Sequence, residues 1–222
     1  MIYNESMKNI DEYKLFIWDF NGTIVDDLEA GLEVQRIMLA ERELEPLSKQ
    51  RYLATFSFPI REWYRYLGYD IEKYPEIAKQ WSELYLEEAK DAPLCPGVER
   101  LLKGALGEGI RQMILSAGHM EMLLPELERL GVGNFFEKVY ALDNHYADTK
   151  RTLALKLKVE AGEDPKNMLL IGDTTEDLEM ARLIGCDCAL IAFGHQSIER
   201  LKREHDNVFA DCNGLYNKLF MR

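Results

Sequence analysis

The chain has 222 residues, 47% of them hydrophobic and 30% charged, which is the composition of a globular protein with one sizeable domain or a core domain and a smaller insert. Acidic residues outnumber basic residues by 39 to 27, and no basic patch offsets the net charge of −12, so we expect no nucleic acid and no anionic membrane as a partner. No apolar run approaches the roughly 18 residues that span a bilayer, residues 1–9 are polar, and the four cysteines are irregularly spaced, so we expect a cytoplasmic protein with reduced thiols.

An all-helical segment interrupts the chain directly after its first strand. The first strand is predicted at residues 15–20. From about residue 28 to residue 90 only helical patterns occur, and a Pro-rich stretch then leads back to further strands. The sequence therefore predicts a small helical domain inserted into a core, with the core at residues 1–27 and 92–222 and the insert at residues 28–91.

Helix boundaries in the insert are marked by residues that start or stop helices. Pro46 ends the first helix, and Ser48 is an N-cap candidate for the second. Pro59 begins a third helix that stops at Gly68, and Pro75 begins the fourth. The insert is also dense in aromatic residues between positions 56 and 85. We expect most of them to pack the small helical core and a few to line a cleft between the two domains.

The rest of the chain alternates between short apolar runs and helical patterns. Strands are predicted at residues 113–116, 139–142, 168–171, 188–193 and, more weakly, 207–210. Helices are predicted at residues 98–106, 120–130, 149–161, 175–184 and 197–204. This alternation indicates the α/β class with a doubly wound, mostly parallel sheet, and such sheets bind ligands at the carboxyl ends of their strands.

Carboxylates follow the first strand and a later one. Asp19 stands at the end of the first strand, followed by Asn21 and by Gly22, which allows a tight turn. Asp173 and Asp177 follow the strand at 168–171. Carboxylate and carbonyl oxygens are the ligands that hard divalent cations prefer. We therefore expect Asp19, the backbone carbonyl of Asn21, Asp173 and Asp177 to hold Mg²⁺.

Hydrogen-bond donors and one lysine follow the other strands. Thr23 offers a hydroxyl and a backbone N–H, and Ser116 is followed by the small residues Ala117 and Gly118. Such a turn can hold a phosphate oxygen. Lys150 opens a helix and supplies fixed positive charge.

Together these residues suit the transfer of a phosphoryl group. A phosphoryl group needs a nucleophile, neutralising cations and hydrogen-bond donors. Asp19 can attack phosphorus and form an aspartyl-phosphate, while a divalent cation reduces the repulsion between carboxylate and phosphate. Each residue alone is weak evidence, but all of them stand at successive strand ends.

The sequence resembles the haloacid dehalogenase-like hydrolases over nearly its whole length. Their four motifs are matched here by Asp19-Phe20-Asn21-Gly22-Thr23, by Ser116, by Lys150 and by Gly172-Asp173-Thr174-Thr175-Glu176-Asp177. The helical insert resembles the cap of the branch that contains phosphoglycolate phosphatases and β-phosphoglucomutases. Leu94-Cys95-Pro96-Gly97-Val98 is similar to the point where the chain of that branch returns to its core.

This resemblance implies a Rossmann-like core, Mg²⁺ as cofactor, and hydrolysis of a small phosphorylated metabolite. It implies catalytic roles for Asp19, Asn21, Ser116 and Lys150. It also places Arg61, in the stretch Phe58-Pro59-Ile60-Arg61, where relatives carry a loop that contacts the substrate. No heptad pattern or isolated apolar face decides between a monomer and a homodimer.

Asn21 departs from the family pattern. Phosphatases of the family usually carry a second Asp at this position, which protonates the leaving oxygen and then activates water. A side-chain amide cannot exchange a proton in this way, and positioned acid–base help typically contributes about 10²–10⁴-fold in rate. Water or another side chain would have to move the proton, and His119 is the nearest candidate in the sequence, although it also fits a solvated helix start.

Three functions remain open at this point. The first is a phosphatase that is slow or that acts on a good leaving group. The second is a dehalogenase-type or phosphonatase-type reaction, although the phosphonatase branch uses a cap lysine where this chain has Arg61. The third is a protein that binds a phosphorylated ligand with little or no turnover. A signalling receiver domain fits less well, because its extra acidic pair lies at the first strand and it has no helical insert.

Overall fold

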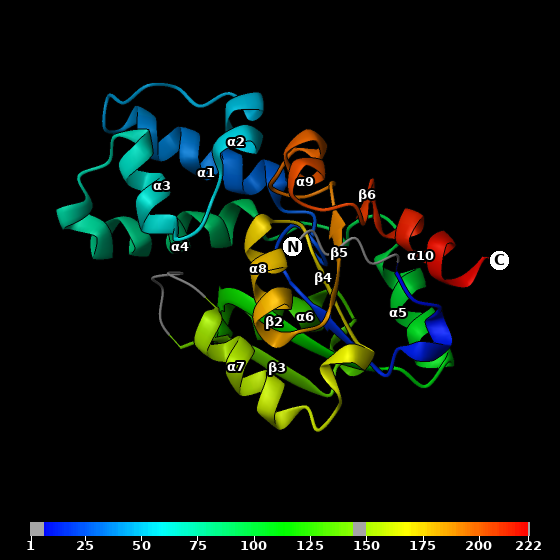
Figure 1. Ribbon diagram of the computed structural model, residues 1–222. Helices are drawn as coiled ribbons and strands as arrows, with labels where there is room; N and C mark the ends of the chain where they lie inside the picture. The colour runs from blue at the N-terminus through cyan, green and yellow to red at the C-terminus, as the bar shows by residue number, and fades with distance from the viewer. Residues whose placement is uncertain (1–6, 144–149, 222) are drawn as a thin grey trace.

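A single parallel sheet forms the centre of the protein. The computed structural model describes residues 7–143 and 150–221. Its sheet has six strands in the order β3-β2-β1-β4-β5-β6, and all neighbouring pairs are parallel (Figure 1). The strands are β1 (Leu15–Trp18), β2 (Arg111–His119), β3 (Lys138–Leu142), β4 (Met168–Gly172), β5 (Asp187–Ile191) and β6 (Val208–Phe209).

Helices cover both faces of this sheet, which confirms the doubly wound α/β fold. Residues of β1 alternate between two apolar clusters, with Phe16 and Trp18 in one and Leu15 and Ile17 in the other, as expected for a strand buried on both faces. The first cluster includes α5 (Val98–Gly107), α6 (Met120–Arg129) and α10 (Cys212–Phe220). The second includes α7 (Arg151–Glu160), α8 (Thr175–Ile184) and α9 (Ile198–Glu204).

The order of the strands places the site. The chain moves from β1 outward to β3, then returns to β4 on the other side of β1. The point where the direction reverses lies between β1 and β4, and open α/β sheets bind ligands in the crevice there. The residues that follow β1, β2 and β4 therefore meet at one edge of the sheet.

Four further helices form the insert, beside the carboxyl end of the sheet (Figure 1). Ser48 caps the second of them by accepting a hydrogen bond from the N–H of Arg51, and Gly68 ends the third with φ +96°, as predicted. The first ends at Ala40, earlier than the prediction at Pro46. The four helices are α1 (Leu28–Ala40), α2 (Lys49–Thr55), α3 (Ile60–Leu67) and α4 (Tyr74–Glu88).

The two chain segments that join the insert to the core pair with each other. The N–H of Asp26 donates to the carbonyl of Pro93 over 2.8 Å, and the N–H of Cys95 donates to the carbonyl of Ile24 over 2.9 Å. One apolar cluster also continues from the sheet into α1, α3 and α4. The division into a core and an inserted domain at residues 28–91 remains a prediction.

Several predicted boundaries differ from the structure. β2 continues to His119 and is irregular after Leu115, whereas the predicted strand ended at 116. The strand predicted at 188–193 ends at Ile191, and α10 was not predicted. The predicted helix start at Thr149 lies outside the described residues. Short 3-10 helices occur at Ile10–Glu12, Ile71–Lys73, Gly133–Phe135 and Pro165–Asn167. Among the residues that the structure describes, no helix has the length and apolar character needed to cross a membrane.

Candidate active site

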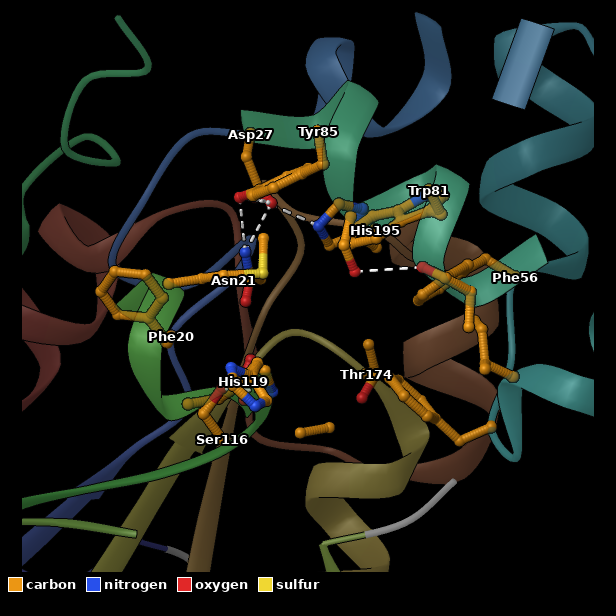
Figure 2. A pocket seen from close by; sticks show the side chains of 18 of the residues that line it. Phe20, Asn21, Asp27, Phe56, Trp81, Tyr85, Ser116, His119, Thr174 and His195 are labelled. Carbon is orange, nitrogen blue, oxygen red and sulfur yellow. Dashed lines mark hydrogen bonds and ion pairs between the residues drawn. The ribbon is translucent and has the colours of Figure 1, made fainter. Parts of the chain in front are cut away.

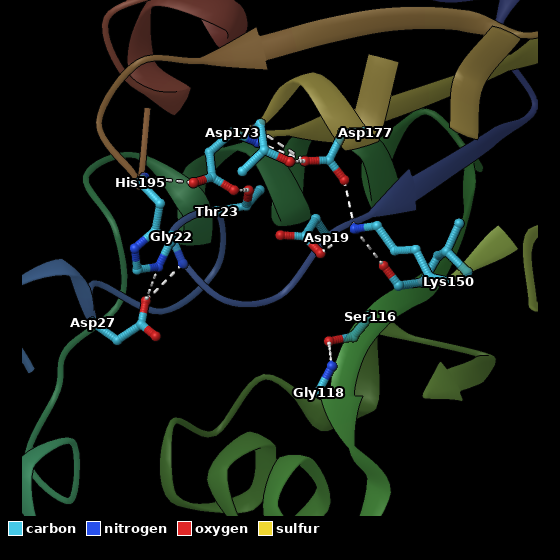
Figure 3. A network of polar contacts seen from close by, with 12 residues as sticks. Asp19, Gly22, Thr23, Asp27, Ser116, Gly118, Lys150, Asp173, Asp177 and His195 are labelled. Atoms are coloured by element: carbon cyan, nitrogen blue, oxygen red, sulfur yellow. Dashed lines mark hydrogen bonds and ion pairs between the residues drawn. The ribbon is translucent and has the colours of Figure 1, made fainter. Parts of the chain in front are cut away.

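Lys150 joins the carboxylates that follow β1 and β4. It is the N-cap residue of α7, and its Nζ lies 2.6 Å from Oδ1 of Asp19 and 2.5 Å from Oδ1 of Asp177 (Figure 3). All three side chains are buried. Burial alone would lower the pKa of Lys150, but the charges of Asp177 and Asp19 raise it above its usual value. The lysine is therefore a permanent cation at this edge of the sheet.

Asp177 owes its position to the start of α8. Its Oδ2 accepts hydrogen bonds from the backbone N–H and the hydroxyl of Thr174, over 3.0 and 2.7 Å, in a capping box. The same oxygen accepts from the N–H of Asp173 over 3.2 Å. Because the other oxygen holds Lys150, the carboxylate of Asp177 is shared between the helix cap and the lysine.

Asp173 is enclosed by hydrogen-bond donors. Its Oδ1 accepts from the hydroxyl of Thr23 over 3.2 Å, and its Oδ2 accepts from the N–H of His195 over 2.6 Å. A Cβ added to Gly194 would lie 2.2 Å from Oδ2, so only glycine allows the backbone to come this close. The backbone around Asp173 is thus shaped to fit its carboxylate.

Asp19, Asp173 and Asp177 form one cluster of buried acids. One carboxylate oxygen from each lies within 4.8 Å of the others. Burial raises the pKa of Asp19 well above its usual value, an effect that Lys150 opposes and that the charges of Asp177 and Asp173 increase. Burial also raises the pKa of Asp173 to about 6. Three carboxylates facing one lysine leave an excess of negative charge, and their oxygens suit a hard divalent cation, so the cluster can bind a metal ion.

Ser116 lies across the site from this cluster, where β2 becomes irregular. Its Oγ accepts a hydrogen bond from the N–H of Gly118 over 2.9 Å. Ser116, Ala117 and Gly118 line the cavity between the sheet edge and the insert, together with Asp19 and Lys150. The predicted phosphate-binding turn is therefore brought close to Asp19, the predicted nucleophile.

Asn21 is held by a carboxylate and a tyrosine. Its Nδ2 donates to Oδ2 of Asp27 over 2.8 Å and to the hydroxyl of Tyr85 over 2.7 Å, and that hydroxyl in turn donates to Asp27 (Figure 2). A carboxylate can only accept, so the amide nitrogen must face Asp27. The amide oxygen lies 3.4 Å from the position that a Cβ of Gly118 would occupy, on the side of the Ser116 turn. Asn21 thus presents an acceptor to the site.

His195 and Asp27 form a buried ion pair, and His195 also connects the core with the insert through Tyr52. Nε2 of His195 lies 3.2 Å from Oδ1 of Asp27, and Nδ1 lies 2.9 Å from the hydroxyl of Tyr52 in α2. Burial would lower the pKa of His195, but Asp27 and Asp173 raise it to about 9. Burial would likewise raise the pKa of Asp27, but His195, Asn21 and Tyr85 lower it. The sequence analysis identified neither residue as part of the site.

Some predicted site residues do not reach the cavity. Thr23 and Gly22 lie behind it, where Thr23 bonds Asp173 and the N–H of Gly22 donates to Asp27 over 2.7 Å. Arg61 is exposed on α3, 5.7 Å from the ring of Tyr74, and is not among the described residues that line the cavity. The structure therefore does not bring Arg61 to the substrate side. His119, the N-cap residue of α6, does line the cavity.

Comparison with known proteins identifies the family of this chain. The sequence model of the haloacid dehalogenase-like hydrolases matches residues 16–191. A phosphoglycolate phosphatase of Synechococcus elongatus is 23% identical over 83% of this chain and 86% of its own length. A phosphoglycolate phosphatase of Aquifex aeolicus is 24% identical over 82% of this chain and 86% of its own length.

Solved structures show the same fold. A haloacid dehalogenase-like hydrolase from Streptococcus pneumoniae aligns with a TM-score of 0.78 at 18% identity, over 93% of this chain and 98% of its own. A hydrolase from Pseudomonas syringae aligns with a TM-score of 0.75 at 20% identity, over 93% and 97% of the two chains. The family match covers most of the sheet and the whole insert. The chain therefore belongs to the haloacid dehalogenase-like hydrolase family.

Proposed function

We propose that this protein is a Mg²⁺-dependent phosphatase that hydrolyses a small phosphomonoester through an aspartyl-phosphate on Asp19. The observation that supports this most directly is the bridge from Lys150 to both Asp19 and Asp177, with Asp173 in the same cluster. Asp19 as nucleophile, Lys150 as fixed cation and Asp173 as a metal ligand then line one cavity with the Ser116 turn, while Asp177 lies behind Lys150. The relatives named as phosphatases support the same activity.

In the first step Asp19 attacks phosphorus. Its Oδ1 accepts from Lys150, so we assign the attack to Oδ2. The new Asp19–phosphorus bond forms as the bond from phosphorus to the leaving oxygen breaks, and the alkoxide takes a proton from water. Ser116 and the N–H groups of its turn donate hydrogen bonds to the phosphoryl oxygens.

In the second step water attacks the phosphorus of the aspartyl-phosphate. Inorganic phosphate leaves, and Asp19 is restored as a carboxylate. The amide oxygen of Asn21 can accept a hydrogen bond from this water and orient it, but it cannot take the proton. The proton passes to solvent or to the phosphate itself, which makes both steps slower than in a site with a carboxylic acid at this position.

The acid cluster would hold the metal ion. We assign Mg²⁺ to Asp19, Asp173 and the backbone carbonyl of Asn21, with Asp177 as a further contributor whose oxygens also serve Lys150 and the α8 cap. When bound, the ion supplies positive charge that offsets the repulsion between the carboxylates and the phosphoryl group. We further propose that residues 28–91 act as a cap that encloses the substrate, a small phosphorylated metabolite.

The test is hydrolysis of 4-nitrophenyl phosphate with Mg²⁺ and with EDTA, using the wild type and Asp19→Asn. We expect phosphate release only from the wild type with Mg²⁺. Asp206→Asn, an exposed acid far from the site in the sequence, is the matched control and should behave as the wild type. Release that persists in EDTA or in Asp19→Asn would exclude this mechanism.

One observation favours a second candidate function. Both N–H bonds of the Asn21 amide are engaged by Asp27 and Tyr85, so this position is built for a neutral side chain. A protein that binds a phosphorylated ligand and turns it over poorly would need no acid here. Burst release of less than one phosphate per protein, with tight binding of a phosphate mimic, would support this alternative.

A further inference from the structure

The cavity at the phosphoryl site has a wall on the side of the insert that is mainly aromatic. It has a volume of about 140 Å³ and runs from the acid cluster of the core to helices α2–α4 of the insert. The insert contributes rings that include Tyr52, Phe56, Phe58, Trp63, Trp81 and Tyr85.

These rings pack against one another in stacked and edge-to-face pairs, the geometries in which an aromatic ligand also packs against protein rings. Trp81 is stacked on Tyr85, with ring centroids 4.7 Å apart and an interplanar angle of 16°. Phe56 is stacked on Tyr52 at 5.1 Å and meets Trp63 edge to face at 5.0 Å. A further ring placed among them can bury its area and gain the same geometry.

Positive charge is missing from the insert side of the cavity. Among the described lining residues, those from α1–α4 include no lysine or arginine. Lys150 is engaged by Asp19 and Asp177, and His195 is paired with Asp27. His119 lies next to Ser116, at the phosphoryl end of the cavity (Figure 2).

Glu126 of α6 adds an acid to the same wall. Its side chain is 13% exposed, and its Oε1 lies 3.6 Å from Nη2 of Arg129 without a hydrogen bond. Burial raises the pKa of Glu126 to about 7, and the charge of Asp27 raises it further. A ligand with a carboxylate on this side would meet an acidic side chain and, among the described lining residues, no free cation, and burying an unpaired charge is costly.

We propose that the substrate is the phosphate ester of a neutral alcohol that carries one aromatic ring, and not an ester of a hydroxy acid such as phosphoglycolate. This inference rests on the proposed phosphatase function and defines its substrate class. The aromatic walls supply the binding energy for the leaving group. The lack of a free cation among the described lining residues, together with Glu126, disfavours an anionic leaving group.

The test compares esters that all release a primary alcohol, so that leaving-group chemistry differs little. The esters are benzyl phosphate, ethyl phosphate and 2-phosphoglycolate, each assayed with Mg²⁺. We expect kcat/KM for benzyl phosphate to exceed that for each of the other two at least tenfold. Glu126→Gln should raise the ratio of kcat/KM for 2-phosphoglycolate to kcat/KM for benzyl phosphate several-fold. Glu128→Gln, an exposed acid on the same helix, should leave this ratio unchanged.

Binding separates a failure of this inference from a failure of the proposed function. Benzylphosphonate carries the benzyl group and phosphonoacetate carries the carboxylate, each attached to phosphorus through a carbon–phosphorus bond that is not hydrolysed. Their affinities for the Mg²⁺-loaded protein are measured by calorimetry. If 2-phosphoglycolate is hydrolysed as well as benzyl phosphate, the substrate class is wrong while the phosphatase stands. If no ester is hydrolysed, the phosphatase is wrong, and the inference stands only if benzylphosphonate binds at least tenfold tighter. Equal affinities, or no binding of either, overturn it.

Discussion

The side-chain nitrogen of Asn21 lies 2.8 Å from Oδ2 of Asp27. His195, also bonded to Asp27, helps to lower the pKa of that carboxyl group against the effect of burial, so Asp27 is an anion. An aspartate at position 21 would place a second carboxylate at hydrogen-bond distance from it. Asn21 and Asp27 are therefore a matched pair, and the uncharged amide is the partner that this local charge requires.

Exchanging the two side chains should restore the acid. Asn21→Asp alone should lower the free energy of unfolding by about 1–2 kcal/mol, because like charges this close shift a pKa by roughly one unit or more. Asn21→Asp combined with Asp27→Asn keeps one amide facing one carboxylate but also removes the partner of His195. Its stability is therefore compared with that of Asp27→Asn alone, to which Asn21→Asp should add little further loss. The double variant should also raise kcat/KM on an alkyl phosphate about tenfold more than on 4-nitrophenyl phosphate, because poor leaving groups need the proton most.

Chemical unfolding and steady-state kinetics measure both effects. Asp27→Asn alone is the control, because it breaks the pair without adding an acid. If Asn21→Asp is as stable as the wild type, the repulsion argument fails. If the double variant hydrolyses alkyl and aryl esters with an unchanged ratio of rates, position 21 does not limit proton transfer.

Mg²⁺ should stabilise the folded protein through the acid cluster. A ligand present at about 100 times its Kd, and bound only by the folded state, adds about 2.7 kcal/mol to the free energy of unfolding. We expect Mg²⁺ to raise the melting temperature of the wild type and to have little effect on Asp173→Asn. The measurement is thermal unfolding with Mg²⁺ and with EDTA, and Asp206→Asn should keep the full shift. An equal shift in Asp173→Asn would place the ion elsewhere.

His195 should make stability fall at alkaline pH. Its pKa is about 9 in the folded protein and about 6.5 when unfolded. Because the folded-state pKa is raised, the stabilisation is complete below pH 6.5 and is lost as the pH rises through 9. It amounts to at most roughly 3 kcal/mol. The free energy of unfolding in EDTA, measured from pH 6 to pH 10, should show the advantage of the wild type over His195→Gln shrinking across this range. A constant difference would show that the histidine is not charged.

The motif residues could be predicted because each needs only local information. Asp19, Ser116 and Asp173 each follow an apolar run, and the carboxyl ends of neighbouring parallel strands meet at one edge of a sheet. The pairing of β2, β1 and β4 then brings them together without any knowledge of side-chain packing. Lys150 follows the same logic from the next strand.

The parts that were missed depend on packing between distant segments. Asp27 and His195 belong to no recognised motif, and nothing in the sequence indicates that His195 would bond Asp27 through one ring nitrogen and Tyr52 through the other. Helix α10 differs, because the sequence does contain the cap and the apolar spacing that predict a helix there. Asp211 caps the helix, and Leu215 and Leu219 are four residues apart on its buried face.

The carbonyl of Phe56 joins the insert to α9 and to Gln196, just before that helix. These hydrogen bonds should hold the insert closed over the core. The carbonyl accepts from Nε2 of Gln196 over 3.0 Å and from Nη1 of Arg200 over 2.6 Å. A hydrogen bond from a charged group contributes about 1.5–3 kcal/mol, so Gln196→Ala with Arg200→Ala should shift the insert toward an open arrangement. We expect a larger radius of gyration in X-ray scattering without ligand, and a smaller difference once Mg²⁺ and BeF₃⁻ are added.

Kinetics give an independent readout of the same motion. An insert that opens more readily should raise KM several-fold, because part of the binding energy is used to close it. Arg203→Ala, on the exposed side of α9, should change neither the scattering nor KM. Scattering curves of the double variant that match the wild type in both conditions would show that the contacts at Phe56 do not hold the insert closed, and that closure depends on the aromatic and apolar contacts around the cavity.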